Sequence, residues 1–508
     1  MTSQPTTLAE PAAALRSRVP RSALPWAAVA ALGLGLLGCN PAPKYTVPTL
    51  PGKPPVAYKE NQSGSAQAQA NGWKQADPKD AMLRGKWWKV FGDPQLDALE
   101  EQLVIGNQNI KQYFANYMAA RALVRNAHAS LFPSVTLAPS ASNQGHGPSA
   151  ATTSGSGQSY ELPLNVSWEP DLFGKISNSV RADAHAAQVS AANIANETLS
   201  EQSSLAQYYF ELRGQDAMQE LYRRQIASYG ETLRLTQVLY QNGIDSEQDV
   251  AQAESNLRTA EANAVAIGTT RAQYEHAIAL LVGEAAGKFS LPVQPLKATP
   301  PYIPAGLPSQ LLERRPDIAA AERTVAEANA LIGVGKAAYY PTISLTASAG
   351  TASSDLSRLL GYGARFWSIG ASASETLLDF GANKANVQRY EAQYDADAAS
   401  YRQTVLNAFK EVEDYLVASR QLAEQEARQH LAVQAALRYE VLAEVRYRTG
   451  LDAFLNVLTA QNSALASQQT LVTLQTNRMT TAVQLIAALG GGWNAADLPS
   501  EKEVAAKP

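Results

Sequence analysis

The sequence predicts a mainly α-helical fold in which two similar halves each combine a pair of very long helices with a pair of β-strands. Three observations support this prediction: an internal repeat with a nearly constant offset, two long stretches without proline, and four short segments in which apolar and polar residues alternate. The chain has 508 residues, of which 45% are hydrophobic and only 17% are charged. Because soluble domains carry roughly 25% charged residues, we expect much of the surface to consist of uncharged polar residues and alanine.

The two halves of the chain match each other over most of their length. Two pairs of segments lie 208 residues apart, namely Asn109-Ile110 with Asp317-Ile318 and Leu131-Phe132-Pro133 with Tyr339-Tyr340-Pro341. Further pairs lie 207 residues apart, namely Phe173-Gly174 with Phe380-Gly381, Tyr208 with Tyr415, residues 240–245 with 447–452, and Gly283 with Gly490. An offset that drifts by one residue over this span indicates a true repeat. We therefore divide the chain into a first repeat (73–283), a linker (284–315), a second repeat (316–490) and a C-terminal tail (491–508).

Long helices are predicted because proline is absent between Pro170 and Pro292 and between Pro341 and Pro499. Apolar residues with helical spacing mark one face in each half: Leu205, Tyr208, Tyr209 and Leu212, then Val405, Phe409, Val412 and Leu416. We expect a leading helix in each half, at 95–130 and 316–338. A helix from about 175 to 240 would follow and reach roughly 100 Å at 1.5 Å per residue. The narrow apolar stripes suit a hollow barrel with one layer of helices, although an ordinary antiparallel coiled coil has the same pattern.

Four alternating segments predict β-strands at about 134–142, 160–168, 342–349 and 366–373, and the loops 143–158 and 350–364 separate the members of each pair. Each segment has the length of a transmembrane strand. Aromatic residues near the strand ends, as in a membrane girdle, are Tyr160, Trp168, Phe366 and Trp367. Four strands cannot close a barrel in lipid, so a spanning sheet would be shared, and three chains would supply twelve strands. Pro139 and Pro163 interrupt the pattern, which leaves two soluble hairpins as the alternative.

The first 38 residues have the pattern of a secretory signal. Three arginines precede an apolar run from Ala23 to Leu37, which is shorter than the roughly 20 residues that span a bilayer. The run ends in Leu36-Leu37-Gly38-Cys39, which resembles a lipobox, the motif whose cysteine is diacylated after cleavage. Leu37 departs from the usual small residue, and an ordinary exported cysteine is the alternative. Two acyl chains would attach Cys39 stably to outer-membrane lipid, and residues 39–72 would then form a lipidated N-terminal tether.

Several other classes of protein find little support. The formal net charge of −4 and the lack of a basic run argue against a nucleic-acid partner. Cys39 is the only cysteine, and the five histidines do not have metal-ligand spacing on one helical turn. The sequence contains no nucleophile elbow and no phosphate-binding loop. We therefore predict no enzymatic activity, no cofactor and no metal site.

The chain resembles the outer-membrane factors of tripartite efflux pumps, the TolC-like family, in its NodT-type lipoprotein branch. Five motifs over about residues 85–493 carry the resemblance: Trp87-Trp88-Lys89-Val90-Phe91-Gly92-Asp93-Pro94, Glu313-Arg314-Arg315-Pro316-Asp317-Ile318, Tyr340-Pro341-Thr342-Ile343-Ser344, Leu377-Leu378-Asp379-Phe380-Gly381, and Tyr447-Arg448-Thr449-Gly450. The resemblance implies a homotrimer with a twelve-stranded outer-membrane β-barrel and a periplasmic α-helical barrel. Residues 73–95, 284–316 and 491–508 would form an equatorial belt around it.

The resemblance also implies function and partners. The chain would be a passive exit duct through which drugs or other small molecules leave the cell. Its partners would be a periplasmic adaptor, or membrane fusion protein, and an inner-membrane transporter of the resistance-nodulation-division (RND) type. Two alternatives stay open: an exit duct for type I protein secretion, and a structural periplasmic coiled coil without a pore.

The long helices of this family narrow at the periplasmic end and close the duct. The resemblance places this gate at the turns Asn242-Gly243 and Thr449-Gly450, where glycine suits a left-handed residue. The gate residues carried over by position are Asp249, Tyr447, Asp452, Leu455, Asn456 and Thr459. Asn456 and Thr459 stand where the family often has acids. Tyr447 is expected to bond to Asp249 or another carboxylate on a neighbouring hairpin, although simple packing between helices would also explain Tyr447 and Leu455.

Overall fold

The computed structural model describes residues 40–50, 52, 55, 57–60, 85–144, 157–296, 299–303 and 308–506. The predicted signal peptide, Cys39 and the tether beyond Glu60 lie outside these residues. The chain forms two compact units. A sheet unit contains residues 130–178 and 333–383 with the N-terminal residues up to Ala42, and a helical unit contains residues 43–129, 179–332 and 384–508.

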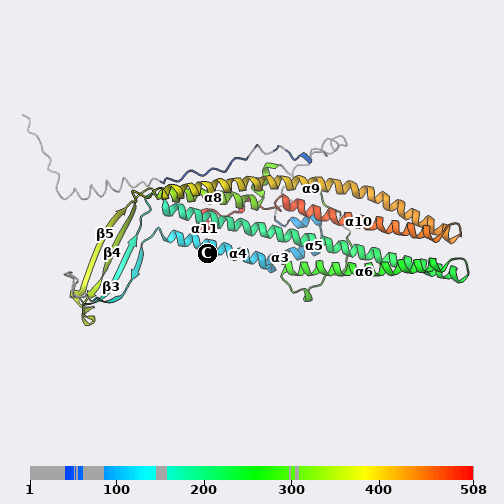
Figure 1. Ribbon diagram of the computed structural model, residues 1–508, viewed down its shortest axis with the longest axis horizontal. Coiled ribbons are helices and arrows are strands. Elements are labelled where there is room, and N and C mark those ends of the chain that lie inside the picture. Colours follow the sequence, from blue (N-terminus) through cyan, green and yellow to red (C-terminus); the bar gives the residue numbers. More distant parts are fainter. Residues whose placement is uncertain are drawn as a thin grey trace, which may run out of the picture. The chain divides into compact units, whose positions relative to one another are not determined.

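The sheet unit contains β1 (Ser134–Leu137), β2 (Ser140–Gln144), β3 (Gly157–Trp168), β4 (Thr342–Ser353) and β5 (Arg365–Ser374). All pairs are antiparallel in the order β1-β3-β4-β5, and β2 continues along the same edge of β3 as β1 (Figure 1). The predicted strands 160–168, 342–349 and 366–373 are confirmed, each within a longer strand. The prediction of one unbroken strand over 134–142 is wrong, because the strand stops at Ala138-Pro139, where proline has no N–H to donate.

Pro163 does not interrupt its strand. It lies inside β3 directly opposite Gly350 of β4, and its carbonyl accepts the N–H of Ala138 at 3.2 Å. A Cβ atom on residue 350 would approach the Leu162 carbonyl oxygen to 2.3 Å. Glycine is therefore required opposite the proline, and this pair lets the sheet continue through a residue that usually ends strands.

The two faces of the sheet differ sharply in polarity. Cross-strand register places one set of apolar side chains on a single face: Val135, Leu137, Leu162, Leu164, Val166, Trp168, Ile343, Leu345, Ala347, Ala349, Trp367, Ile369 and Ala371. The opposite face carries Ser, Thr and Asn side chains that bond one another, with Ser348 donating to Asn165 at 2.8 Å and Ser344 lying 2.9 Å from Ser372. Ile369 is 80% exposed although it is apolar. Such a sheet fits lipid on one side and water on the other.

Replacing Ile369 with arginine should therefore block insertion into a bilayer. An arginine on the lipid face of a membrane strand costs about 2–4 kcal/mol at the bilayer midplane. Ser368→Arg is the matched control, because it places the same charge next along β5 on the polar face. We expect Ile369→Arg to lower the fraction inserted into phospholipid vesicles strongly and Ser368→Arg to lower it little. Equal losses would contradict the assignment of the two faces.

The helices are α3 (Pro94–Gly106), α4 (Gln108–Ala129), α5 (Lys175–Gln241), α6 (Glu247–Val282), α8 (Pro316–Ala337), α9 (Ala382–Arg448) and α10 (Phe454–Ala488). The two longest, α5 and α9, have 67 residues each, which confirms the predicted long helices. The expected helix over 95–130 is divided at Asn107, whose side chain accepts the Ile110 N–H at 3.0 Å and starts α4. Among the described helices, none combines the length and apolar character that a membrane span needs.

Short elements occupy the segments expected to form an equatorial belt: η2 (Trp87–Phe91), η3 (Ala286–Lys288), η4 (Pro308–Gln310), α7 (Leu311–Arg314), η7 (Ala495–Asp497) and α11 (Glu501–Ala505). They pack on the helices around a core that includes Trp87, Leu96, Leu205, Tyr209 and Met479. In Figure 1, α10 lies between α9 and α5, and hydrogen bonds such as Gln429 to the Ser467 carbonyl and Gln484 to Gln207 join it to both.

The described part of the N-terminal segment is extended, as its composition predicts, but it is not a free tether. Residues 43–60 lie along α8 and α9. The Thr49 carbonyl accepts from Arg402 at 2.9 Å, and the backbone N–H groups of Lys59 and Glu60 donate to Glu413 at 2.8 and 3.0 Å. Tyr58 is buried among apolar side chains of α7, α9 and α10. The segment is therefore held against the second repeat.

A buried ionic cluster holds the helical unit together. Asp216 of α5 is fully buried and accepts from Arg213 at 2.9 Å and from Arg271 of α6 at 2.6 Å. It also accepts the backbone N–H of Gln294 at 2.8 Å. The cluster joins α5, α6 and the extended segment around Leu291, which follows α6.

Candidate gate at the helical hairpin tips

Each repeat contains a long helical hairpin, α5–α6 or α9–α10, and each turn begins with a left-handed glycine. Gly243 has φ 72° and Gly450 has φ 74°. The residue after each glycine bonds five residues back, from Ile244 to the Leu239 carbonyl at 2.9 Å and from Leu451 to the Arg446 carbonyl at 2.8 Å. This is the Schellman motif, which satisfies carbonyls that the helix end leaves open. The two tips thus share one geometry, as the repeat predicts.

Tyr447 joins the two hairpins of one chain. Its hydroxyl donates to the carboxylate of Asp245, which lies in the other turn. The side chain is 5% exposed, its ring centroid lies 5.6 Å from that of Phe454, and it packs against Ala253 of α6. Burial, and then the bond to Asp245, raise the pKa of Tyr447. The hydroxyl therefore keeps its proton and remains a donor at physiological pH. Tyr447 both packs between the hairpins and bonds across them.

Asp249 does not accept this bond. It forms a capping box with Ser246, whose hydroxyl donates to the Asp249 carboxylate at 2.7 Å while the Asp249 N–H donates back at 3.3 Å. The structure thus assigns Asp249 to the first turn of α6 and leaves Asp245 as the partner of Tyr447. Asp245 was missed in the sequence, although the repeat pairs it with Asp452, which was chosen.

Asp452 stabilises the second tip from within its own hairpin. It accepts from Arg446 at 3.1 Å, from the Asn456 side chain, and from the Ala453 N–H at 3.2 Å. Ala453 has no side chain that could cap α10, so the neighbouring Asp452 supplies the acceptor. The hydrogen bonds from Asn456 and Arg446 lower the pKa of Asp452. The sequence did not single out Arg446, which balances this charge.

The two remaining predicted gate residues lie further along α10. Leu455 is 66% exposed, so it does not pack between the hairpins of one chain. Thr459 returns its hydroxyl to the Leu455 carbonyl at 2.8 Å. Ile244 and Leu451, which occupy the same position in the two repeats, are also exposed. The tips therefore present apolar side chains outward from the chain.

Above the tips, polar side chains of α10 bond to α5 at intervals. Gln461 donates to Thr232 at 3.0 Å and Gln469 to Tyr222 at 2.6 Å. Tyr229 donates to Asn462 at 3.0 Å. These bonds hold the two hairpins of one chain side by side over several turns, so any opening that separates neighbouring hairpins is easier at another boundary.

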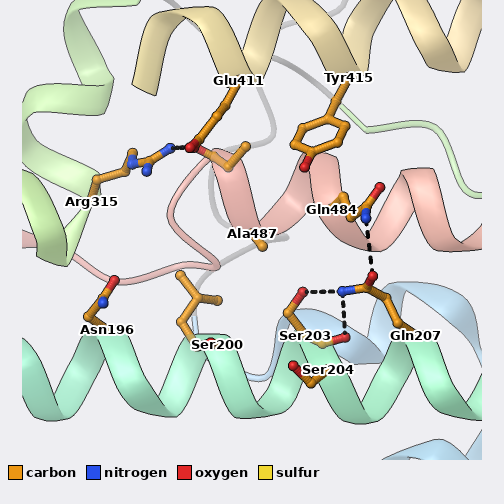
Figure 2. A pocket seen from close by; sticks show the side chains of 12 residues that line it. Asn196, Ser200, Ser203, Ser204, Gln207, Arg315, Glu411, Tyr415, Gln484 and Ala487 are labelled. Carbon is orange, nitrogen blue, oxygen red and sulfur yellow. Dashed lines mark hydrogen bonds and ion pairs between the residues drawn. The ribbon is translucent and has the colours of Figure 1, made fainter. Parts of the chain in front are cut away.

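A cavity of about 280 Å³ lies between α5 and α9, where α10 ends and α8 begins (Figure 2). Arg315, the residue before α8, donates to Glu411 at 2.7 Å and to Asp317 at 2.7 Å. Gln484 donates to Gln207 at 3.1 Å, and Gln207 donates to Ser203 at 3.1 Å (Figure 2). The polar groups that line the cavity thus bond one another. The arrangement is that of a joint between helices.

A sheet with one apolar face, combined with paired hairpins that start from 67-residue helices, defines an outer-membrane channel of the TolC-like class. The model of the outer membrane efflux protein family matches residues 99–284 and 307–491, and the chain belongs to this family. The two matched stretches correspond to the two repeats. The chain is therefore an outer-membrane channel of an efflux pump.

Individual relatives match over nearly their full length. The toluene efflux pump outer membrane protein TtgC of Pseudomonas putida is 33% identical over 475 residues, which cover 92% of this chain and 95% of that protein. The cation efflux system protein CusC of Escherichia coli is 31% identical over 482 residues, covering 91% and 97%. The outer-membrane channel OprN superposes with a TM-score of 0.80 at 29% identity, covering 90% of this chain and 100% of that one. The Campylobacter jejuni channel CmeC gives a TM-score of 0.81 at 25% identity, covering 90% and 96%.

Proposed function

We propose that the chain assembles as a homotrimer and serves as the passive exit duct of a tripartite pump, together with a periplasmic adaptor and an inner-membrane RND transporter. The observation that carries this proposal is the sheet, whose apolar face is exposed and whose order ends in β1 on one side and β5 on the other. Lipid tolerates no open sheet edge. Three copies would join these edges into a closed barrel of twelve strands, counting β1 and β2 as one. Conduction through such a barrel needs no catalysis.

The proposed cargo is a small molecule. Relatives of this chain carry the names of toluene, antibiotic and cation efflux proteins. Those cargoes share little chemistry, and the polar face of the sheet offers mainly neutral Ser, Thr and Asn side chains. We therefore place cargo selection in the transporter and conduction in this chain.

Native mass and conductance test this function together. The purified protein in detergent should have a mass near three chains and should form channels in a planar bilayer. Deleting its gene should sensitise cells to small toxic compounds without changing the set of secreted polypeptides. A stable monomer, or a trimer without conductance, would contradict the proposal. Loss of one secreted polypeptide with unchanged drug sensitivity would favour a type I secretion duct.

We further propose that the tips are the periplasmic gate, with Tyr447, Asp452, Leu455, Asn456, Thr459 and the turn glycines Gly243 and Gly450 in the roles described above. Asp245 joins this set, and Asp249 supports it by holding the start of α6. Three copies would bring six tips around one axis. The exposed Leu455 would then line the narrowest part.

We also propose that Cys39 carries the lipid. Its neighbour Asn40 exchanges two side-chain hydrogen bonds with Asn178 at the start of α5, at 2.9 and 3.2 Å. Asn40 also lies against Gly174, where a Cβ would come within 2.9 Å of its side chain. Gly174 is close in sequence to Trp168, at the end of β3. A lipid on the preceding residue would thus start near the rim of the apolar face.

Replacing Cys39 with serine should abolish labelling by radioactive palmitate in growing cells, because serine offers no thiol for diacylation. Labelling of wild-type protein in the same cells is the positive control. Native mass of the variant should remain near three chains, because the described contacts of the N-terminal segment begin at Asn40. Undiminished label on the variant would exclude Cys39 as the attachment site.

A further inference from the structure

The structure contains one complete junction between a first and a second repeat, inside the chain. There, β3 pairs with β4, and Leu164 lies directly opposite Ala349. Beside this pairing, Phe173 stacks on Tyr340 with ring centroids 4.8 Å apart and an interplanar angle of 14°. All of these residues belong to the sheet unit.

The repeat relates each of these residues to a counterpart. Phe173 corresponds to Phe380 and Tyr340 to Phe132, and both counterparts are aromatic. Leu164 of β3 corresponds to Ala371 of β5, and Ala349 of β4 corresponds to Ala141 of β2, by the same offsets of 207 and 208. These counterparts do not meet inside the chain, because β5 and the β1–β2 edge stand at opposite ends of the strand order.

Phe380 shows what the missing half of this second junction leaves open. Its side chain is 93% exposed, whereas Phe173 is partly covered by Tyr340. Its φ of 52° makes it the one non-glycine residue with positive φ in the described part of the chain. Bulky residues rarely adopt this conformation in the absence of compensating contacts. Phe132 is 61% exposed, which leaves most of its surface accessible to a second ring.

We propose that the interface between two copies of the chain repeats the junction between its two halves, so that β5 pairs with β2 of the next copy with Ala371 opposite Ala141, and Phe380 stacks on Phe132. This proposal rests on the trimeric duct proposed above and specifies how its copies meet. The faces provide an internal check. Ala371 lies on the apolar face, and Ala141 shares the sequence parity of Val135 and Leu137. A slip of one residue would turn an apolar face toward water.

Paired cysteines in the full-length chain test this register. Side chains directly opposite in an antiparallel pair have Cβ atoms about 4.5–5.5 Å apart, which is near disulfide distance. Ala371→Cys with Ala141→Cys should therefore cross-link on mild oxidation into species of two and three chains on a non-reducing gel. The matched control is Ala371→Cys with Leu137→Cys, four residues along the same edge and roughly 13 Å away. We expect at least a tenfold lower yield from the control, with Cys39 present in all variants.

The outcomes separate this inference from the proposed function. A trimer by native mass that links poorly through Ala141, or better through Asn143 or Leu137, would overturn the register and leave the duct standing. A cross-link confined to single chains would also overturn it. A monomer by native mass would remove the proposed function, and this inference with it.

The aromatic pair has its own readout in the temperature at which the trimer dissociates in detergent. Phe380→Ala and Phe132→Ala should each lower it, and the double variant should lower it no further than the larger single effect, because both changes remove one contact. Phe380→Tyr keeps a ring and should restore the wild-type temperature. Additive losses would mean that the two rings do not meet.

Discussion

Replacing Asp216 with alanine should destabilise the helical unit by about 3–5 kcal/mol, because removing one partner of a buried ion pair leaves the other charge uncompensated. Two cations depend on this carboxylate, Arg213 at 2.9 Å and Arg271 at 2.6 Å. Both arginines also bond the backbone of the segment after α6, Arg213 to the Pro292 carbonyl at 2.7 Å and Arg271 to the Leu291 carbonyl at 2.8 Å. Loss of Asp216 therefore weakens the attachment of this segment as well.

Urea unfolding of the purified protein in detergent, followed by helical circular dichroism, measures this effect. Glu220→Ala is the matched control on the same helix. Glu220 pairs with Arg223 at 2.7 Å, but the arginine is largely exposed, and exposed pairs contribute only about 0–1 kcal/mol. We expect a clear fall of the urea midpoint for Asp216→Ala and almost none for Glu220→Ala. Equal midpoints would mean that the buried cluster does not stabilise the fold.

The counterpart cluster in the second repeat shows why this effect cannot be inferred from the repeat alone. Arg420 and Arg478 stand at the positions of Arg213 and Arg271, but Ala423 stands at the position of Asp216. Arg420 pairs instead with Glu60 of the N-terminal segment at 2.6 Å, and Arg478 pairs with Glu426. The repeat thus keeps both cations and moves the anions, so alanine is tolerated at position 423 only because other carboxylates replace it.

Long-range periodicity made the main elements predictable. The absence of proline and the glycines at 243 and 450 define two helices whose observed ends lie within a few residues of the predicted ones. The division of the leading helix at Asn107 was not predictable in this way, because asparagine ends a helix only where its side chain can cap the next one. The docking of the N-terminal segment was also missed. Its composition indicates an extended chain, but the burial of Tyr58 depends on side chains of α7, α9 and α10 that are distant in sequence.

The gate shows the same limit at finer scale. The resemblance selected Tyr447, and the structure places it between the two hairpins with a bonded carboxylate. Which carboxylate it meets depends on the turn. Ser246 engages Asp249 in the capping box, so Asp245 alone is positioned to accept the tyrosine. A choice between two acids four residues apart needs the turn geometry, which position in the sequence does not supply.

Tyr447→Phe and Asp245→Ala should each open the proposed duct. Either change removes the hydrogen bond between the two tips of one chain. A bond to a charged acceptor contributes about 1.5–3 kcal/mol, and a trimer contains three of them. Since each 1.4 kcal/mol is a factor of ten in an equilibrium, losing all three should raise the open population by at least tenfold. Combining the two changes should add little, because both remove the same bond.

Asp249→Ala separates this explanation from a general effect of acidic charge at the tips. It removes a carboxylate four residues from Asp245, but the bond it breaks is the cap of α6, which contributes about 1 kcal/mol to that helix. Single-channel recordings in a planar bilayer should therefore show long open periods for Tyr447→Phe and Asp245→Ala and near wild-type closure for Asp249→Ala. Cells with the first two variants should become sensitive to large antibiotics. If Asp249→Ala opens the channel as far as Asp245→Ala does, negative charge rather than the tyrosine bond sets the closed state.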